Sequence, residues 1–183
     1  MGGTDKAFLP LAGRPLIAHV IDRLGCAQAI SANGDPARFA AFGLPVLADD
    51  MPDRPGPLAG VLAGLDWAAT QGASGIATAA TDTPFFPRDC AERLAAGAAT
   101  AGASIAMARG MTPQGSRRHP TFAWWSADLR ESLRQFLTDG GRKVGAFAEQ
   151  AGVVDIDFPG DEPFLNINTP DDLIRAAELA PKA

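Results

Sequence analysis

The chain alternates short apolar runs with longer amphipathic stretches, and this alternation limits its possible folds more than any other feature. Pro15 and Gly25 bracket a stretch whose apolar residues recur near the helical period, which predicts a helix over 16–24. Residues 75–81 form a run of small apolar residues that is typical of a buried strand. Repeated strand–helix units predict an α/β fold, with a mostly parallel sheet and helices on both faces.

The same signals predict the remaining elements. We expect strands over 29–32, 45–48, 104–108, 121–125 and 153–157, and helices over 37–42, 57–65, 88–98, 128–137, 143–150 and from Thr169 onward. No repeat or flexible linker divides the sequence, so we expect a single domain over residues 1–183.

Composition and charge argue against several classes of partner. The net charge is -5 and no long basic run occurs, which argues against nucleic acid. No apolar run approaches the ~18 residues that a membrane span needs, and no export signal opens the chain. Cys26 and Cys90 have neither metal-binding nor CxxC spacing, so we expect free thiols and a cytoplasmic location.

Two segments have the residue types needed to bind nucleotide phosphates. Paired glycines precede Lys6, and such a loop lets the backbone approach an anion while the lysine supplies positive charge. Asp82 falls where the apolar strand 75–81 ends, and a carboxylate there can hold Mg²⁺ together with substrate phosphates. The structural alternatives are a frayed terminus for the first segment and a turn cap before Pro84 for the second.

Three further segments are candidate binding sites. Residues 49–60 place carboxylates after a strand, where the loop could hold a base or ribose, or form an acidic surface turn. The basic groups at 117–119 and 142–143 could receive a phosphorylated substrate or remain solvated. Asn166 and Asn168 alternate, which puts both amides on one side of an extended segment. They could bind a heterocycle or carboxylate, although Asn168 could instead serve a turn.

Eight segments, taken together and in order, resemble the molybdenum cofactor guanylyltransferase family. They are MGGTDK, LAGRPL, SANGDPARF, DDMPDRPGPLAG, TDTPFFP, RRHPTFAWW, GGRKV and FLNINTPDDL, and they cover nearly the whole chain. The resemblance implies a Rossmann-like nucleotidyltransferase fold. It also implies an enzyme that joins GMP from Mg-GTP to molybdopterin and releases pyrophosphate, with molybdoenzymes or their chaperones as further partners.

The resemblance also assigns residues to roles by position. Lys6 would contact nucleotide phosphates, Asp49 the nucleoside, and Asp82 both Mg²⁺ and the nucleotide. Ser31 aligns with a nucleoside-contacting asparagine of the family, and Asn33 is a second candidate for that role. The pterin side of the site would be formed by Arg118, His119, Asn166 and Asn168.

One departure from the family pattern concerns the N-terminal motif. Family members begin with a strand and a loop of the form LAGGxSxRMGG, whereas this sequence starts at the Met of that motif. The missing strand is central in such sheets, so its two neighbours would lack a ladder partner. We therefore expect the functional product to begin upstream, with roughly 15 to 25 further residues. The alternatives are a cytidylyltransferase acting on the same pterin and a non-catalytic nucleotide- or cofactor-binding module.

Overall fold

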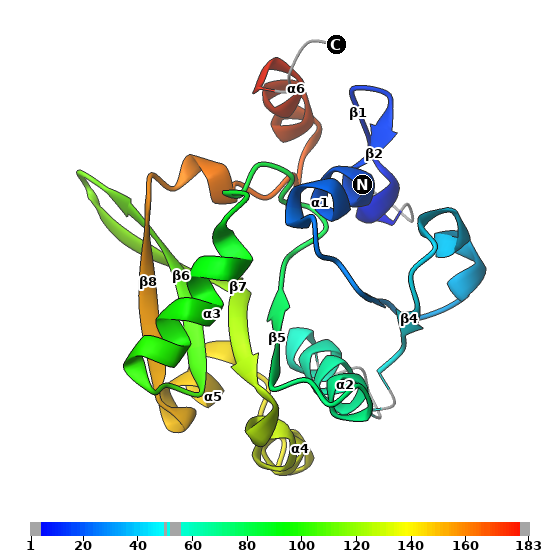
Figure 1. Ribbon diagram of the computed structural model, residues 1–183. Coiled ribbons are helices and arrows are strands. Elements are labelled where there is room, and N and C mark those ends of the chain that lie inside the picture. The colour runs from blue at the N-terminus through cyan, green and yellow to red at the C-terminus, as the bar shows by residue number, and fades with distance from the viewer. Residues whose placement is uncertain (1–4, 50, 52–55, 180–183) are drawn as a thin grey trace.

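The computed structural model describes residues 5–49, 51 and 56–179. Its main sheet contains, in spatial order, β5 (Gly75–Thr78), β7 (Gly115–Ser126), β6 (Ile105–Thr112) and β8 (Val153–Pro159) (Figure 1). β8 is parallel to β6, whereas β7 is antiparallel to both β5 and β6, so three of the four strands share one direction. The predicted α/β class is therefore confirmed, and the main sheet is mixed, because two of its three strand pairings are antiparallel.

Helices cover both faces of this sheet, as predicted. The helices are α1 (Leu16–Leu24), α2 (Pro57–Thr70), α3 (Cys90–Ala101), α4 (Arg130–Thr138), α5 (Val144–Ala151) and α6 (Pro170–Leu179). Side chains alternate along a strand, so Ile105 and Met107 pack with α2, α4 and α5, whereas Ala106 and Ala108 pack with α3 and α1. Each face thus has its own apolar core. Within the described residues, no helix is long and apolar enough to cross a membrane.

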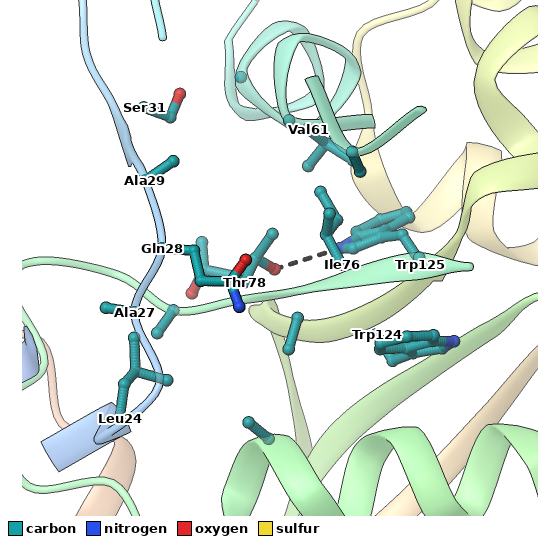
Figure 2. Close-up of a pocket in the computed structure, with 18 of the residues that line it drawn as sticks. Leu24, Ala27, Gln28, Ala29, Ser31, Val61, Ile76, Thr78, Trp124 and Trp125 are labelled. Carbon is teal, nitrogen blue, oxygen red and sulfur yellow. Dashed lines mark hydrogen bonds between the residues drawn. The ribbon is translucent and has the colours of Figure 1, made fainter. Parts of the chain in front are cut away.

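Two pairs of strands lie apart from the main sheet. β3 (Ile30–Ser31) and β4 (Val46–Leu47) form a parallel pair of their own, and β1 (Pro10–Leu11) and β2 (Arg14–Pro15) form a short hairpin. An apolar groove of about 630 Å³ separates β3 from β5. In Figure 2 Ala27 and Ala29 lie on one side of it, and Ile76 and Thr78 on the other. Within the described part of the chain, no strand lies between β3 and β5.

The structure differs from the sequence prediction in several elements. β5 ends at Thr78 rather than at residue 81, and the β1–β2 hairpin was not predicted. Strands β6 and β7 extend beyond 104–108 and 121–125 to form one long hairpin. Residues 37–42 belong to a 3₁₀ helix, η2 (Pro36–Phe42), rather than an α-helix. It begins where the Asp35 carboxylate accepts from the Ala37 N–H and ends at Gly43, whose φ of 64° favours glycine. Further 3₁₀ turns are η1 (Lys6–Phe8), η3 (Ala127–Leu129) and η4 (Glu162–Phe164).

Both cysteines carry free thiols, as the sequence predicts: Cys26 is exposed and Cys90 is buried. Burial raises the pKa of the Cys90 thiol to about 12. Cys90 therefore remains a neutral thiol packed in the apolar core.

Candidate active site

The candidate active site lies where β3, β4 and β5 end. A cavity of about 230 Å³ is lined by Ser31 and Asn33 from the end of β3 and by Thr81, the neighbour of Asp82, from the segment after β5. Asp5 and Arg38 complete its polar lining. In α/β sheets, ligands bind at the carboxyl ends of the strands, so this cavity has the expected position for a nucleotide.

Asn33 and Asp49 form a reciprocal pair beside this cavity. Asn33 Nδ2 donates to Asp49 Oδ2 at 2.6 Å, and the Asp49 backbone N–H donates to Asn33 Oδ1 at 3.1 Å. β3 and β4 are parallel neighbours, so the residues that follow them are brought together. Asp49 Oδ1 is buried and has no hydrogen-bond partner among the described residues. It is an acceptor that a ligand donor could satisfy.

Arg38 fixes the loop that carries Asn33. Its guanidinium donates to the Asn33 carbonyl oxygen at 3.0 Å and to Asp5 Oδ2 at 3.0 Å. The same group lies 5.1 Å from the centre of the Phe39 ring and 5.8 Å from that of Phe8. These contacts fix the backbone at Asn33, whose side chain bonds Asp49.

Asp82 and Asn166 meet through a fully buried threonine. The Thr83 hydroxyl lies 2.7 Å from Asn166 Oδ1 and 3.3 Å from Asp82 Oδ1. The Ile167 backbone N–H donates to the Asp82 carbonyl oxygen at 2.8 Å. These contacts fix the segment that carries Asn166 against the segment that follows β5 and carries Asp82.

Lys6 joins the same group of residues. Its Nζ donates to Asn168 Oδ1 at 2.6 Å. Ile167, which lies between the two asparagines, is fully buried in an apolar cluster with Leu11 and Leu16. The structure therefore brings Lys6, Asp82, Asn166 and Asn168 together, from parts of the chain that are up to 162 residues apart.

Ser31 points toward α2. A Cβ atom added to Gly60 would lie 2.6 Å from Ser31 Oγ, so the hydroxyl fits only because that helix position is glycine. This contact explains one glycine of the segment 49–60; its residues 50 and 52–55 lie outside the described part of the chain.

Arg118 and His119 lie on β7 and face carboxylates. Arg118 makes a two-pronged contact with Asp155, at 2.6 and 3.0 Å, and also bonds Glu149. These contacts raise the pKa of the Arg118 guanidinium. His119 Nε2 lies 2.7 Å from Asp161 Oδ1. Neither residue lines the cavity beside Asn33, and their pterin contacts stay a prediction.

The other basic group, at 142–143, also lies apart from the cavity. Arg142 donates to the carbonyl oxygens of Leu137 and Gly141 at 2.9 and 2.7 Å, which fixes the turn between α4 and α5. Its role toward a phosphorylated substrate remains a prediction.

Three residues of this region were not singled out by sequence reasoning: Thr83, Arg38 and Asp161. Thr83 and Asp161 contact residues that are 83 and 42 positions away, respectively. No local pattern reveals such contacts. Arg38 follows the Asn33–Asp35 turn, within the segment SANGDPARF that resembles the family. This resemblance is the signal by which the sequence could have indicated Arg38.

A metal ion could be held by Asp82 together with substrate groups. The described residues contain no group of three or more His, Cys, Asp or Glu side chains arranged around a metal position. Mg²⁺ is often bound through one or two carboxylates, with phosphates and water completing its coordination. The single half-buried carboxylate of Asp82 therefore fits an ion that is held mainly by substrate phosphates and water.

The larger groove between β3 and β5 has a different chemistry. Its walls are mainly apolar, and Glu92 is the one carboxylate among the described residues that line it. Trp125 Nε1 donates to Thr78 Oγ1 at 3.1 Å at its side, the contact drawn in Figure 2. The described lining of the groove thus offers little of the positive charge that a triphosphate requires.

Comparisons with known proteins show the family of this chain. The model of the MobA-like NTP transferase domain matches residues 1–153. A molybdenum cofactor guanylyltransferase from Mesorhizobium japonicum is 48% identical over 189 residues, which cover 98% of this chain and 89% of the relative. One from Cereibacter sphaeroides is 49% identical over 185 residues, which cover 100% of this chain and 91% of the relative.

Solved structures share the fold. Molybdopterin-guanine dinucleotide biosynthesis protein A from Archaeoglobus fulgidus matches with a TM-score of 0.74 at 23% identity, over 97% of this chain and 91% of that one. The 4-diphosphocytidyl-2C-methyl-D-erythritol synthase from Anaerococcus prevotii matches with a TM-score of 0.75 at 10% identity, over 94% and 92%. The predicted Rossmann-like nucleotidyltransferase fold is confirmed. The chain belongs to the molybdenum cofactor guanylyltransferase family.

Proposed function

We propose that this protein transfers GMP from GTP to molybdopterin, forming the guanine dinucleotide cofactor and pyrophosphate. The observation that carries the proposal is the Asn33–Asp49 pair beside a polar cavity at the ends of β3 and β4, whose lining includes Thr81, the residue before Asp82. Its near full-length relatives are named for the same transfer. Molybdoenzymes, or chaperones that serve them, would receive the product.

The arrangement suggests a division of roles within the site. The amide–carboxylate pair of Asn33 and Asp49 offers donors and acceptors to a nucleoside, and Asp49 Oδ1 still has an acceptor position open among the described residues. Lys6, which contacts Asn168, would supply positive charge for phosphates. Asn166 and Asn168 would face the pterin substrate. The family resemblance implies the same for Arg118 and His119 on β7.

The reaction itself requires little covalent chemistry from the protein. An oxygen of the terminal phosphate of molybdopterin would attack the α-phosphorus of GTP in line with the bond to the β-phosphate. That bond breaks as the new phosphorus–oxygen bond forms, and pyrophosphate leaves. The attacking phosphate is already an anion, so no general base is needed. Positioning and charge neutralisation dominate such transfers, and Lys6 and Asp82 are the residues placed to provide them.

Mg²⁺ is the metal we propose for this site. When bound by Asp82, it would neutralise charge on the triphosphate as the α-phosphorus is attacked. The contact that fixes the Asp82 segment to Ile167 uses the Asp82 carbonyl oxygen, so it does not occupy the carboxylate, whose Oδ1 lies 3.3 Å from the Thr83 hydroxyl.

The test is a competition assay with the purified protein, Mg²⁺ and molybdopterin. GTP, CTP and ATP are supplied together at equal concentration, and each dinucleotide product and the released pyrophosphate are quantified. We expect the guanine dinucleotide to dominate. Preferential use of CTP would indicate the cytidylyl alternative, and nucleotide binding without pyrophosphate release would indicate a binding module; either result contradicts the proposal.

A further inference from the structure

A strap connects strand β8 of the main sheet to the candidate active site. We use this name for residues 160–169, the orange segment that leads from β8 to α6 in Figure 1. At the sheet end the Gly160 N–H donates to the Met111 carbonyl oxygen at 2.8 Å. At the site end the strap carries Asn166 and Asn168, which contact Thr83 and Lys6. The position of both asparagines therefore depends on how the strap is held at its start.

His119 holds the start of the strap at two points. Its Nε2 lies 2.7 Å from Asp161 Oδ1, and its ring stacks on Phe164 with centroids 4.4 Å apart and an interplanar angle of 18°. Phe164 in turn packs edge-on against Phe122 and Phe158, at 5.2 and 5.4 Å. One side chain thus fixes both ends of the short η4 turn.

The surroundings of His119 suit a structural contact better than a ligand contact. The residue is only 8% exposed, and burial lowers the pKa of its imidazole even though Asp161 acts in the opposite direction. A neutral ring then donates Nε2–H to the carboxylate. Arg117 lies 3.3 Å from the other Asp161 oxygen, so this carboxylate is held from two sides.

A glycine on β6 makes room for the same carboxylate. A Cβ added to Gly110 would lie 2.8 Å from Asp161 Oδ1 and 2.8 Å from the Gly160 carbonyl oxygen. Side chains are therefore excluded from the point where the strap leaves the sheet. The glycine and the histidine come from different strands, yet both define the position of Asp161.

We propose that His119 is a positioning residue, which acts through Asp161 and Phe164 to hold Asn166 and Asn168 against Thr83 and Lys6. This inference rests on the proposed function, since the transfer reaction gives the two asparagines their role. It assigns His119 no contact with the pterin, in contrast to the role that the family resemblance implies.

The first arm of the test measures the strap itself, by amide hydrogen exchange of peptides covering residues 160–169. His119→Phe keeps an aromatic ring on Phe164 but removes the donor to Asp161, and Gly110→Ala displaces Asp161 from the other side. Both should speed exchange in the strap, including at the Ile167 N–H. His119→Gln, which retains a donor, should restore most of the protection. Unchanged exchange in both damaging variants would overturn the proposal.

A matched control separates local loosening from general instability. Phe136→Leu removes an aromatic pair with Phe147, 5.2 Å apart, on the opposite face of the sheet. It should lower the melting temperature. The rate of hydrogen exchange in the strap, expressed relative to exchange through global unfolding, should remain as in the unaltered protein. If this variant loosens the strap as much as His119→Phe does, the effect is not specific to His119.

The second arm measures kinetics and molybdopterin affinity. A small displacement of positioning groups can cost up to ~10²-fold in rate, so His119→Phe should lower kcat by ~10-fold or more, and His119→Gln should recover it. A direct pterin ligand would instead show a raised Kd for molybdopterin with an undisturbed strap, which would refute the proposal. If the unaltered protein makes no dinucleotide, the proposed function fails, while the exchange arm still decides whether His119 anchors the strap.

Discussion

Asp82 uses its backbone and its side chain for different partners. Its carbonyl oxygen accepts from the Ile167 N–H, whereas its carboxylate faces the Thr83 hydroxyl and the site. Asp82→Ala should therefore leave the fold intact and remove the charge that balances the triphosphate. We expect turnover to fall by on the order of 10² or more, as on loss of one preorganised electrostatic contact. The measurement is kcat across a Mg²⁺ titration, with the melting temperature as control. Near-normal rates at limiting Mg²⁺ would make Asp82 a turn residue only.

His119 should also make stability depend on pH. Burial lowers the pKa of the folded-state imidazole below its usual value of about 6.5, so protonation favours the unfolded chain. The stability that the neutral ring contributes is complete above about pH 6.5 and is lost as the pH falls toward the folded-state pKa. Asp22, Asp157 and Asp172 have lowered carboxyl pKa values, so their contributions are lost only below about pH 4.

Urea unfolding of the unaltered protein and of His119→Gln at pH 7.5 and 5.5 checks this expectation. The free energy of unfolding should fall between these pH values in the unaltered protein, and the fall should be smaller in the variant. Equal decreases in both proteins would show that His119 does not titrate with folding.

At the scale of elements, the contact between β3 and α2 depends on Gly60. Alanine is favoured over glycine in a helix by up to ~1 kcal/mol, but its Cβ would lie 2.6 Å from Ser31 Oγ. We expect Gly60→Ala alone to gain little stability or to lose some. In a Ser31→Ala background, the atom nearest to the added Cβ is the Cβ of residue 31, at 3.6 Å. Gly60→Ala should then raise the free energy of unfolding by ~0.5–1 kcal/mol. A double-mutant cycle in urea measures this coupling, and additive effects would contradict it.

Elements with strong local signals could be predicted from the sequence. Pro15 and Gly25 bound α1 as expected, and Pro57 begins α2. The outer half of the β6–β7 hairpin, residues 109–112 and 115–120, was not predicted from the sequence. These residues are mostly polar and do not alternate between apolar and polar. Arg109 and Arg118 instead make ion pairs with Asp155 on β8, at 3.0 and 2.6 Å. Such pairs stabilise a strand whose sequence shows no apolar face.

The candidate site was only partly predictable for a similar reason. Asp49 and Asp82 follow apolar strands, and this position marks them in the sequence. The strap contacts of Lys6 and of Asn166 depend on distant parts of the chain meeting in space. The buried Thr83 has no local signal at all, because its role arises only from the packing around it.

In the whole molecule, β3 and β5 each present to the groove between them an edge that pairs with no other strand of the described residues, and the space between the edges is apolar. An extended apolar segment fused ahead of residue 1, with a glycine-rich linker, should pair with both edges and bury apolar side chains. Burial of one or two such side chains contributes a few kcal/mol, so the melting temperature should rise by ~5 °C or more. The control fusion carries serine and lysine at the apolar positions. Equal melting temperatures for the two fusions would show that the groove does not receive a strand.

We propose that the site at the ends of β3, β4 and β5 transfers GMP to molybdopterin. The most direct test is the ratio of guanine to cytosine dinucleotide formed in competition, measured for the unaltered protein and for Asn33→Ala. We expect a strong preference for GTP, with a raised KM for GTP in Asn33→Ala because the Asp49 carboxylate loses its 2.6 Å donor. Equal or better use of CTP by the unaltered protein, or an unchanged KM in the variant, would contradict this account of the site.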